Sequence, residues 1–324
     1  MRIRFILFFS LLVFTGSLSK AQKIGVDLSK DTYIFAIKGN DTLRLDKYEG
    51  LNRGNNPSPA MIYVFGGGFF TGERYSESFL PYFKFFTDQG YTVFSIDYRL
   101  GFKNVNIEGK PGIKDFIALF ENTIYMAVED LLDATRFILE HADEWNIDRE
   151  KIVTSGSSAG GITVLQGGYE ISTRSERARR VPDNFNYAGI ISFAGAIYSN
   201  QGNLKWSANT APIQLFHGDA DKNVPYNRVK FCKLAFFGSK NVAKRLEKYD
   251  LPYYFYTEVN TDHRVAGTPM SDNLEDIQIF LDKYVARKKP LQTVVTVDPL
   301  DRPKVKKNFS IFDYIRANFQ PDQN

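Results

Sequence analysis

Hydrophobic residues follow two alternating patterns along the chain, and these patterns predict its secondary structure. Short apolar runs without a helical period predict buried strands, whereas apolar positions three or four residues apart predict amphipathic helices. Strands are expected at Tyr33–Ile37, Thr42–Leu45, Ala60–Phe65, Tyr91–Ile96, Lys151–Thr154, Ala188–Phe193, Ala211–Phe216 and Tyr253–Tyr256. Helices are expected at Phe79–Gln89, Tyr125–Asn146, from Gly160 to about Tyr169, Lys240–Tyr249 and Asn273–Arg287. This alternation is typical of right-handed βαβ units, so we predict an α/β fold with a mostly parallel central sheet and helices on both faces.

The first 21 residues have the three parts of a secretory signal peptide. A basic start precedes an apolar run from Phe5 to Phe14, and Ser19 and Ala21 provide the small residues of a cleavage site. The apolar run is far shorter than the ~20 residues that a membrane-spanning helix needs, so we favour a cleaved signal over a membrane anchor. We therefore expect cleavage after Ala21, a secreted or periplasmic location, and no stable membrane insertion of the mature protein.

The charge balance argues against nucleic-acid binding. The 324 residues include 41 Lys and Arg against 37 Asp and Glu, a formal net charge of +4. The expected signal peptide holds three of the basic residues and no acidic one, which leaves 38 against 37 in the mature chain. A protein with so little excess charge lacks the electrostatic footprint of a nucleic-acid binder. The single cysteine, Cys232, excludes an intramolecular disulfide and a thiol-rich metal site.

Two polar stretches fall outside the alternation of strands and helices. Arg174–Arg180 carries four arginines in seven residues and is interpreted as a solvated loop or a flap. Lys288–Asn324 is polar and interrupted by prolines, with Lys304, Lys306 and Lys307 close together. We expect it to be an extension along the surface, with a functional basic tail as the alternative.

The sequence Gly156-Ser157-Ser158-Ala159-Gly160 fits the pattern G-x-S-x-G between a predicted strand and a predicted helix. A serine on such a sharp turn holds strained backbone angles, so its neighbours two positions away must be very small. The turn raises the Ser158 hydroxyl above the sheet and beside a helix N-terminus, where backbone amides favour a developing negative charge. We therefore predict that Ser158 is a nucleophile, with a plain glycine-rich loop as the alternative.

A second glycine-rich segment, Phe65-Gly66-Gly67-Gly68-Phe69, lies at the end of the strand Ala60–Phe65. Consecutive glycines allow backbone N–H groups to approach a ligand closely. Together with the amide that follows the nucleophile, such groups form the oxyanion hole of acyl-transfer enzymes.

A serine nucleophile requires a base, and the chain offers three histidines. His141 lies on the polar side of a predicted helix, and His217 ends a buried strand, where a packed and hydrogen-bonded role is expected. His263 follows the strand Tyr253–Tyr256 in a loop late in the chain, at the sheet edge where ligand sites of α/β proteins gather. We therefore predict that His263 is the base.

The acid that orients the base is expected in the loop after the preceding strand. Asp221 is the best candidate there, and Asp219 is its competitor. Asp262 is less suitable because a residue adjacent to His263 rarely reaches the imidazole in the required geometry. The order Ser158, Asp221, His263 is the serine–acid–histidine order of one hydrolase architecture.

These motifs together resemble the α/β-hydrolase superfamily, specifically its carboxylesterase and hormone-sensitive-lipase-like group. The resemblance covers about Leu45 to Val285. It rests on Phe65–Phe69, Ser95–Leu100, Ala127–Asp130, Gly156–Gly161 and the segment from His217 through Asp221 to Pro225. It implies Ser158 as nucleophile, Asp221 as acid, His263 as base, and Gly67, Gly68 and Ala159 as oxyanion donors. The sequence departs from this group at Phe65, where histidine is usual, and at Ser157, where an acid is common.

The residue patterns and the resemblance together predict a signal peptide at 1–21, an α/β-hydrolase catalytic domain at 22–287 and a C-terminal extension at 288–324. They further imply a secreted serine carboxylesterase that needs no metal or organic cofactor. By analogy, its substrates are short acyl esters, of the acetyl or feruloyl type, on a small molecule or a plant polysaccharide. A serine exopeptidase or amidase of the same fold and a catalytically inactive binding module are the alternatives.

Overall fold

A computed structural model describes residues 28–50, 54, 56–103, 105, 113–231, 234–300, 302–307, 309–310, 313 and 316. The predicted signal peptide and Cys232 lie outside these residues. Within them, no helix combines the length and the apolar character that crossing a membrane requires.

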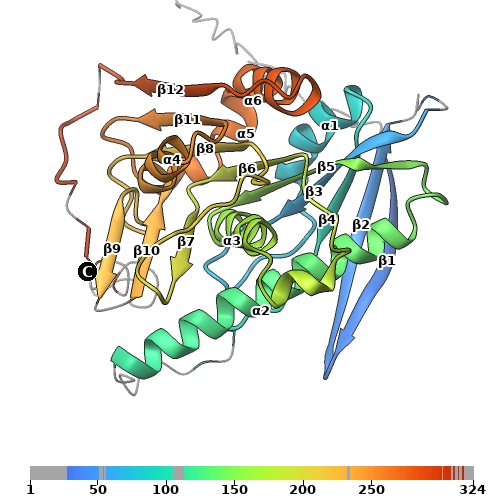
Figure 1. The fold of residues 1–324 in the computed structure, drawn as a ribbon, viewed down its shortest axis with the longest axis horizontal. Helices are drawn as coiled ribbons and strands as arrows, with labels where there is room; N and C mark the ends of the chain where they lie inside the picture. Colours follow the sequence, from blue (N-terminus) through green and yellow to red (C-terminus); the bar gives the residue numbers. More distant parts are fainter. Residues whose placement is uncertain are drawn as a thin grey trace, which may run out of the picture.

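The central sheet contains nine strands of the described chain, in the order β1-β2-β4-β3-β5-β6-β8-β11-β12 (Figure 1). Its strands are β1 Leu28–Lys38, β2 Asp41–Gly50, β3 Ser58–Val64, β4 Thr92–Ile96, β5 Ile147–Ser157, β6 Gly189–Phe193, β8 Ile213–Gly218, β11 Tyr253–Glu258 and β12 Gln292–Val297. The first pairs, β1 with β2 and β2 with β4, are antiparallel, and all pairs from β4 to β12 are parallel. The predicted mostly parallel sheet is therefore confirmed. The strands expected at Tyr33–Ile37 and Thr42–Leu45 lie in its antiparallel pair β1 and β2.

Helices cover both faces of this sheet. They are α1 Leu80–Asp88, α2 Ile113–Glu140, α3 Ala159–Thr173, α4 Ser239–Lys248, α5 Pro269–Asp272 and α6 Leu274–Phe280, with short helices η1 Glu77–Phe79, η2 Arg177–Arg180, η3 His263–Ala266 and η4 Leu281–Ala286. Consecutive residues of β6 face opposite layers. A Cβ on Gly189 would meet Val285 and Phe280, whereas Ile190 touches Gly168 of α3. The central strands β3, β4 and β6 are almost wholly buried because they are covered from both sides.

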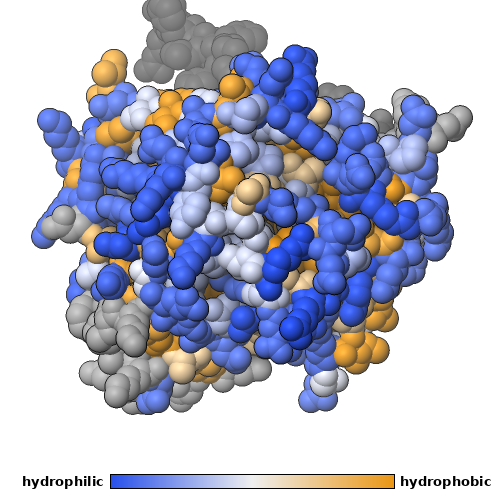
Figure 2. Space-filling model, viewed as in Figure 1, coloured by the Kyte–Doolittle hydropathy of each residue, from blue (hydrophilic) through white to orange (hydrophobic). Residues whose placement is uncertain are grey.

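A small second sheet was not predicted from the sequence. It consists of β7 Ala196–Ser199, β10 Leu234–Gly238 and β9 Arg228–Phe231, all paired antiparallel. These strands have four or five residues each, too few to show a clear period. The face seen in Figure 2 is mostly hydrophilic, with hydrophobic residues in scattered groups, because most apolar side chains lie in the core between the layers.

The central sheet continues beyond residue 287, the predicted end of the catalytic domain. We expected residues 288–324 to form a surface extension, but Gln292–Val297 forms β12 and pairs in parallel with β11. Backbone hydrogen bonds rather than burial hold this edge strand, since most of its side chains are exposed. Beyond β12, Arg302 forms an ion pair with Glu258 at 2.8 Å and Lys307 one with Asp219 at 2.6 Å. The segment after β12 therefore contacts the carboxyl ends of the neighbouring strands.

The arginine-rich stretch 174–180 makes more contacts with the rest of the fold than we expected. We predicted a solvated loop or a flap at 174–180, but its second half forms the short helix η2 against α2. Arg180 forms ion pairs with Asp133 and Glu129 of α2, both at 3.1 Å. Asp133 is nearly buried, so this arginine provides one of its charged partners and fixes the loop.

Candidate active site

Ser158 occupies a tight turn between β5 and α3. Its dihedral angles, φ 52° and ψ −115°, are ones that residues with a side chain rarely adopt. Glycines permit this turn: a Cβ on Gly156 would lie 2.3 Å from the carbonyl oxygen of Gly160, and one on Gly160 would lie 2.0 Å from that of Val64. The backbone N–H of Ser158 donates to the carbonyl of Phe193 at 2.8 Å. The turn therefore has the steric requirement for small neighbours that the sequence pattern predicts.

The structure brings His263 and Asp221 together with Ser158. Nε2 of His263 lies 2.8 Å from Oγ of Ser158, and Nδ1 lies 2.6 Å from Oδ2 of Asp221. The three residues follow the ends of β5, β11 and β8, which are close together at the carboxyl edge of the sheet. Because an ionised carboxylate only accepts hydrogen bonds, Nδ1 carries its hydrogen and Nε2 of the neutral imidazole can accept the serine proton. This arrangement can activate the hydroxyl for nucleophilic attack.

The Asp221 carboxylate is buried and fully hydrogen-bonded. Oδ1 accepts the backbone N–H groups of Asn223 at 2.7 Å and Val224 at 3.0 Å, while Oδ2 faces His263 and lies 3.2 Å from Nε2 of His217. Burial by itself raises the pKa of Asp221. The charge of His263 and the hydrogen bonds from both imidazoles outweigh it and hold the pKa well below its ordinary value. The Asp221 carboxylate therefore stays ionised and holds the imidazole of His263 in one orientation.

His217 is packed and hydrogen-bonded, as the sequence predicts. Its Nε2 faces two acceptors, the carboxylate of Asp221 and the carbonyl of Val224 at 3.3 Å, so this nitrogen carries the hydrogen. Nδ1 lies 2.7 Å from Oγ of Ser239 and accepts its hydrogen. The sequence did not predict that His217 contacts the acid, although the separation of four residues at one strand end was an available signal.

The two competing carboxylates have other partners. Asp219 accepts the backbone N–H of Asn260 at 2.7 Å and pairs with Lys307. Asp262 pairs with Arg264 at 2.8 Å and caps the short helix η3. Among the three aspartates considered from the sequence, Asp221 is the one that contacts the imidazole of the predicted base.

The remaining histidine, His141, lies away from this site, directly after the end of α2. Nδ1 of His141 is 2.8 Å from the carbonyl oxygen of Phe137, and its ring stacks on Trp145 with centroids 4.9 Å apart. We expected a solvated side chain, but the aromatic neighbours cover part of the ring.

The predicted oxyanion donors are next to the nucleophile. Gly67 and Gly68 have φ angles of 122° and 63°, and a Cβ on the preceding Gly66 would lie 3.2 Å from Cβ of Ser158. The N–H groups of Gly67 and Gly68 donate to no described residue. The N–H of Ala159 is in the first turn of α3, where helices have no internal acceptor. These amides are available for a negative oxygen beside Ser158.

The structure explains Phe65 and Ser157, the two residues at which this sequence departs from the carboxylesterase and hormone-sensitive-lipase-like group. Phe65 is buried and stacks on Tyr98, with ring centroids 4.5 Å apart, while the Tyr98 hydroxyl donates to the Phe65 carbonyl at 3.0 Å. An aromatic pair therefore supports the glycine loop. Oγ of Ser157 donates to the carbonyl of Ala266 at 2.7 Å. Because Ala266 ends η3, which begins at His263, this bond connects the turn of Ser158 to the segment that carries His263.

Two further motif residues are structural. Asp130 is fully buried and pairs with Arg99 at 2.9 Å and with Lys38 at 2.6 Å. Arg99 also donates its backbone N–H to Asp130. This cluster connects β1, α2 and the loop after β4, and it contacts none of the three candidate catalytic side chains.

Comparisons with known proteins find similarity to one family model and to two curated esterases. Residues 45–107 and 115–201 match a family model described as BD-FAE. Gut esterase 1 of Caenorhabditis briggsae is 30% identical over 108 residues, which are 33% of this chain and 18% of that protein. Esterase B1 of Culex pipiens is 25% identical over 132 residues, which are 38% of this chain and 21% of that protein. The chain thus matches about a fifth of the length of these curated relatives.

Solved structures share the fold over a larger part of the chain. Esterase 2 of the planctomycete Thermogutta terrifontis with propionate bound has a TM-score of 0.56 and 22% identity, covering 78% of this chain and 93% of that one. The same esterase phosphonylated by cyclosarin has a TM-score of 0.57 and 20% identity, with the same coverage. At this level of identity the likeness establishes the fold.

Proposed function

We propose that this chain, an α/β-hydrolase related to the carboxylesterases, is a serine esterase that hydrolyses short-chain carboxylic esters. One observation carries the proposal: Oγ of Ser158, the imidazole of His263 and the carboxylate of Asp221 form a continuous hydrogen-bonded chain at 2.8 and 2.6 Å. The available amides beside it supply the second requirement of acyl transfer, stabilisation of a negative oxygen.

The reaction has two halves. In the first, Ser158 attacks the ester carbonyl while His263 takes the hydroxyl proton, and Asp221 stabilises the imidazolium that forms. The tetrahedral oxygen accepts hydrogen bonds from the amides of Gly67, Gly68 and Ala159. Collapse of this intermediate breaks the bond to the alcohol, which leaves with the proton from His263. In the second half, water attacks the acyl-enzyme with His263 as base, and the carboxylic acid is released.

The acyl group is proposed to be short, of the acetyl or feruloyl type. Propionate and butyrate are the bound molecules in two structures of the Thermogutta terrifontis esterase, which supports a small acyl group. The alcohol side is proposed to be a plant polysaccharide or a fragment of one. Secretion after cleavage at Ala21 is part of the same proposal, because a polymer of this kind must be met outside the cell.

The decisive experiment compares Ser158→Ala with the parent protein on a short nitrophenyl ester. We expect turnover to fall by roughly a million-fold. A fluorophosphonate probe should label the parent and leave the variant unlabelled. Ser29→Ala is the matched control, since Ser29 is exposed on β1, and it should keep both properties. Most of the activity remaining in Ser158→Ala would refute the assignment of the nucleophile.

A substrate panel separates the remaining alternatives. Acetyl, butyryl, octanoyl and feruloyl esters at one pH define the acyl preference, and a dipeptide anilide tests the exopeptidase or amidase. The proposal predicts the highest kcat/KM on an acetyl or feruloyl ester. A higher kcat/KM on the anilide would favour the peptidase. No turnover of any substrate, together with no labelling by the fluorophosphonate probe, would favour a binding module.

A further inference from the structure

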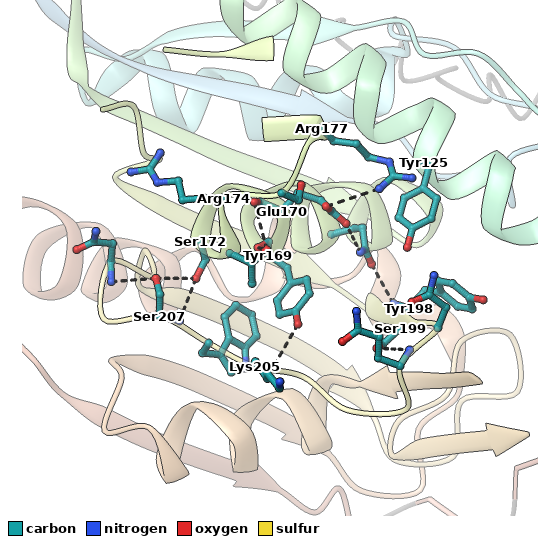
Figure 3. A pocket seen from close by; sticks show the side chains of 17 residues that line it. Tyr125, Tyr169, Glu170, Ser172, Arg174, Arg177, Tyr198, Ser199, Lys205 and Ser207 are labelled. Carbon is teal, nitrogen blue, oxygen red and sulfur yellow. Dashed lines mark hydrogen bonds and ion pairs between the residues drawn. The ribbon is translucent and has the colours of Figure 1, made fainter. Parts of the chain in front are cut away.

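A cavity lies along α3, and Ser158, Asp221 and His263 are not among the residues that line it (Figure 3). Its volume is about 670 Å³, which is in the range of small-ligand sites. It is lined by the second half of α3, the loop after α3, the loop between β7 and β8, and Tyr125 of α2. Gln166 is the lining residue of α3 nearest in sequence to Ser158. A helical rise of about 1.5 Å per residue places it ~12 Å along the axis from Ser158.

Buried hydrogen-bond groups without a partner gather around this cavity. Trp206 lines it and is only 6% exposed, yet its indole N–H has no acceptor among the described residues. The Ser175 hydroxyl and Nε of Arg177, both in the lining, also lack partners within the described chain. Buried donors are costly to leave unsatisfied, so three on residues that line one cavity favour a ligand with acceptor oxygens.

The charges of the lining favour an anion. Arg177 lies with its guanidinium carbon 3.4 Å from the ring centroid of Tyr125, and its nearest acidic contact is Glu170 at 3.9 Å. Glu170 is buried, and Gln166 donates to it at 2.9 Å. Lys205 forms no ion pair with any described residue. Figure 3 shows Arg177 and Lys205 on opposite sides of the cavity, with Glu170 between them.

One further carboxylate, that of Glu121, is not in the lining but is hydrogen-bonded to two lining residues. Glu121 of α2 accepts hydrogen bonds from the Tyr198 hydroxyl at 3.2 Å and from Nδ2 of Asn200 at 3.0 Å. Arg174 adds a third cation to the lining. Positive side chains therefore outnumber negative ones at the cavity even with Glu121 included.

The uncharged part of the lining is typical of a site for sugar hydroxyls. Asn200, Gln201 and Asn209 are exposed amides on one loop of the lining, and each can both donate and accept hydrogen bonds. The rings of Tyr169 and Trp206 meet edge to face, with centroids 5.0 Å apart, and provide an apolar wall. A bare phosphate would use the cations but would leave these amides and rings without a role.

We propose that this cavity is a binding site for a saccharide that carries a carboxylate, such as a uronic acid unit. Arg177 and Lys205 bind the carboxylate, the indole N–H of Trp206 donates to a ligand oxygen, and the amides bind ring hydroxyls. The site is separate from Ser158, and its binding role is additional to ester hydrolysis. It would hold one part of an acidic polysaccharide while another part of the same polysaccharide reacts at Ser158.

The test is calorimetric titration of the full-length protein with trigalacturonate at low salt, beside xylotriose and inorganic phosphate. These probes contain no ester, so binding is measured whether or not the protein is an esterase. We expect trigalacturonate to bind at least tenfold more tightly than either other probe. Lys205→Gln and Arg177→Gln should each weaken binding about tenfold. Trp206→Phe, which keeps a large buried ring and removes the donor, should weaken it by a similar factor.

The control is Lys244→Gln, because Lys244 is exposed on α4 and is not part of the lining. It should bind as the parent does, and Lys205→Gln should hydrolyse a nitrophenyl ester at the parent's rate. Equal binding of phosphate and trigalacturonate would overturn the saccharide assignment. Absence of binding at millimolar trigalacturonate, or equal binding by the parent and all three lining variants, would overturn the site itself.

Discussion

The turn at Ser158 makes a sharp prediction for Gly160→Ala. A Cβ at this position would lie 2.0 Å from the carbonyl oxygen of Val64 and 2.6 Å from that of Phe65, whereas ordinary contacts begin near 3.4 Å. Both oxygens belong to backbone that leads into the glycine loop. The first turn of α3 and the end of β3 must therefore separate by more than about 1 Å to admit one methyl group.

This separation has two measurable costs. Overpacking of a tight contact destabilises a protein by typically 1–3 kcal/mol, which for a large domain corresponds to a fall in Tm of roughly 2–12 °C. The same movement displaces the nucleophile from the amides of Gly67 and Gly68. A misplacement of about 1 Å between reacting groups can cost 100-fold, so kcat should fall by about that factor.

Differential scanning fluorimetry and ester hydrolysis measure the two effects on the same preparations. Gly54→Ala is the matched control, because a Cβ there meets nothing within 4 Å, and it should retain both the Tm and the kcat of the parent. If Gly160→Ala also retained both, the close contact between α3 and β3 would not exist in solution, and the steric account of the turn would be wrong.

Two further substitutions test the groups around the base. Asp221→Asn should lower kcat by about 10⁴-fold, because an amide no longer fixes the imidazole tautomer; a kcat near the parent's would contradict the role of this acid. Because the folded state lowers the pKa of Asp221, its ionised carboxylate stabilises the fold at pH values above 3.8, the ordinary pKa of this group. This stabilisation is lost as the pH falls from there through the folded-state pKa. The Tm difference between parent and Asp221→Asn should therefore narrow below about pH 4, and a constant difference would refute this linkage. Ser157→Ala removes the 2.7 Å hydrogen bond to the Ala266 carbonyl and should lower kcat about tenfold with little change in KM; a lower Tm with an unchanged kcat would make the bond purely structural.

The sequence predicts the central sheet well because its signal is local. Strands such as β3 and β6 are buried on both faces, and this burial appears directly as continuous apolar runs. The small sheet has no such signal, since Ala196 of β7 pairs with Gly238 of β10, 42 residues away in the chain. Pairing over that distance depends on the completed fold.

Two elements differ from their predicted boundaries because the sequence carries no local signal for the difference. The helix predicted over Asn273–Arg287 is divided into α6 and η4, with Asn273 just before it, because amphipathic spacing does not distinguish one helix type from another. The strand β12 alternates weakly between exposed and partly exposed positions. A strand that buries few side chains gives no apolar run to detect, so its place at the sheet edge could not be predicted.

The candidate site also has a part that could be predicted from the sequence and a part that could not. The triad residues could be predicted because each follows a strand at the carboxyl edge, where topology brings distant loops together. The contact of Ser157 with Ala266 depends on a loop conformation that no pattern encodes, whereas the four-residue separation of His217 and Asp221 was a signal that the prediction did not use. The cavity along α3 was equally hidden, although its arginine-rich loop was visible as an unusual stretch. The signal peptide, the domain limits and the catalytic roles stay predictions.

The position of β12 has a practical consequence for producing shortened versions of this protein. A fragment that stops at residue 287 would expose the edge of β11 along six backbone pairs. Strands of other molecules could then pair with this edge. The fragment would also discard Arg302 and Lys307, whose ionic contacts reach the strand ends next to the imidazole loop. Such a fragment should aggregate and react slowly, so the tail belongs in any engineered form.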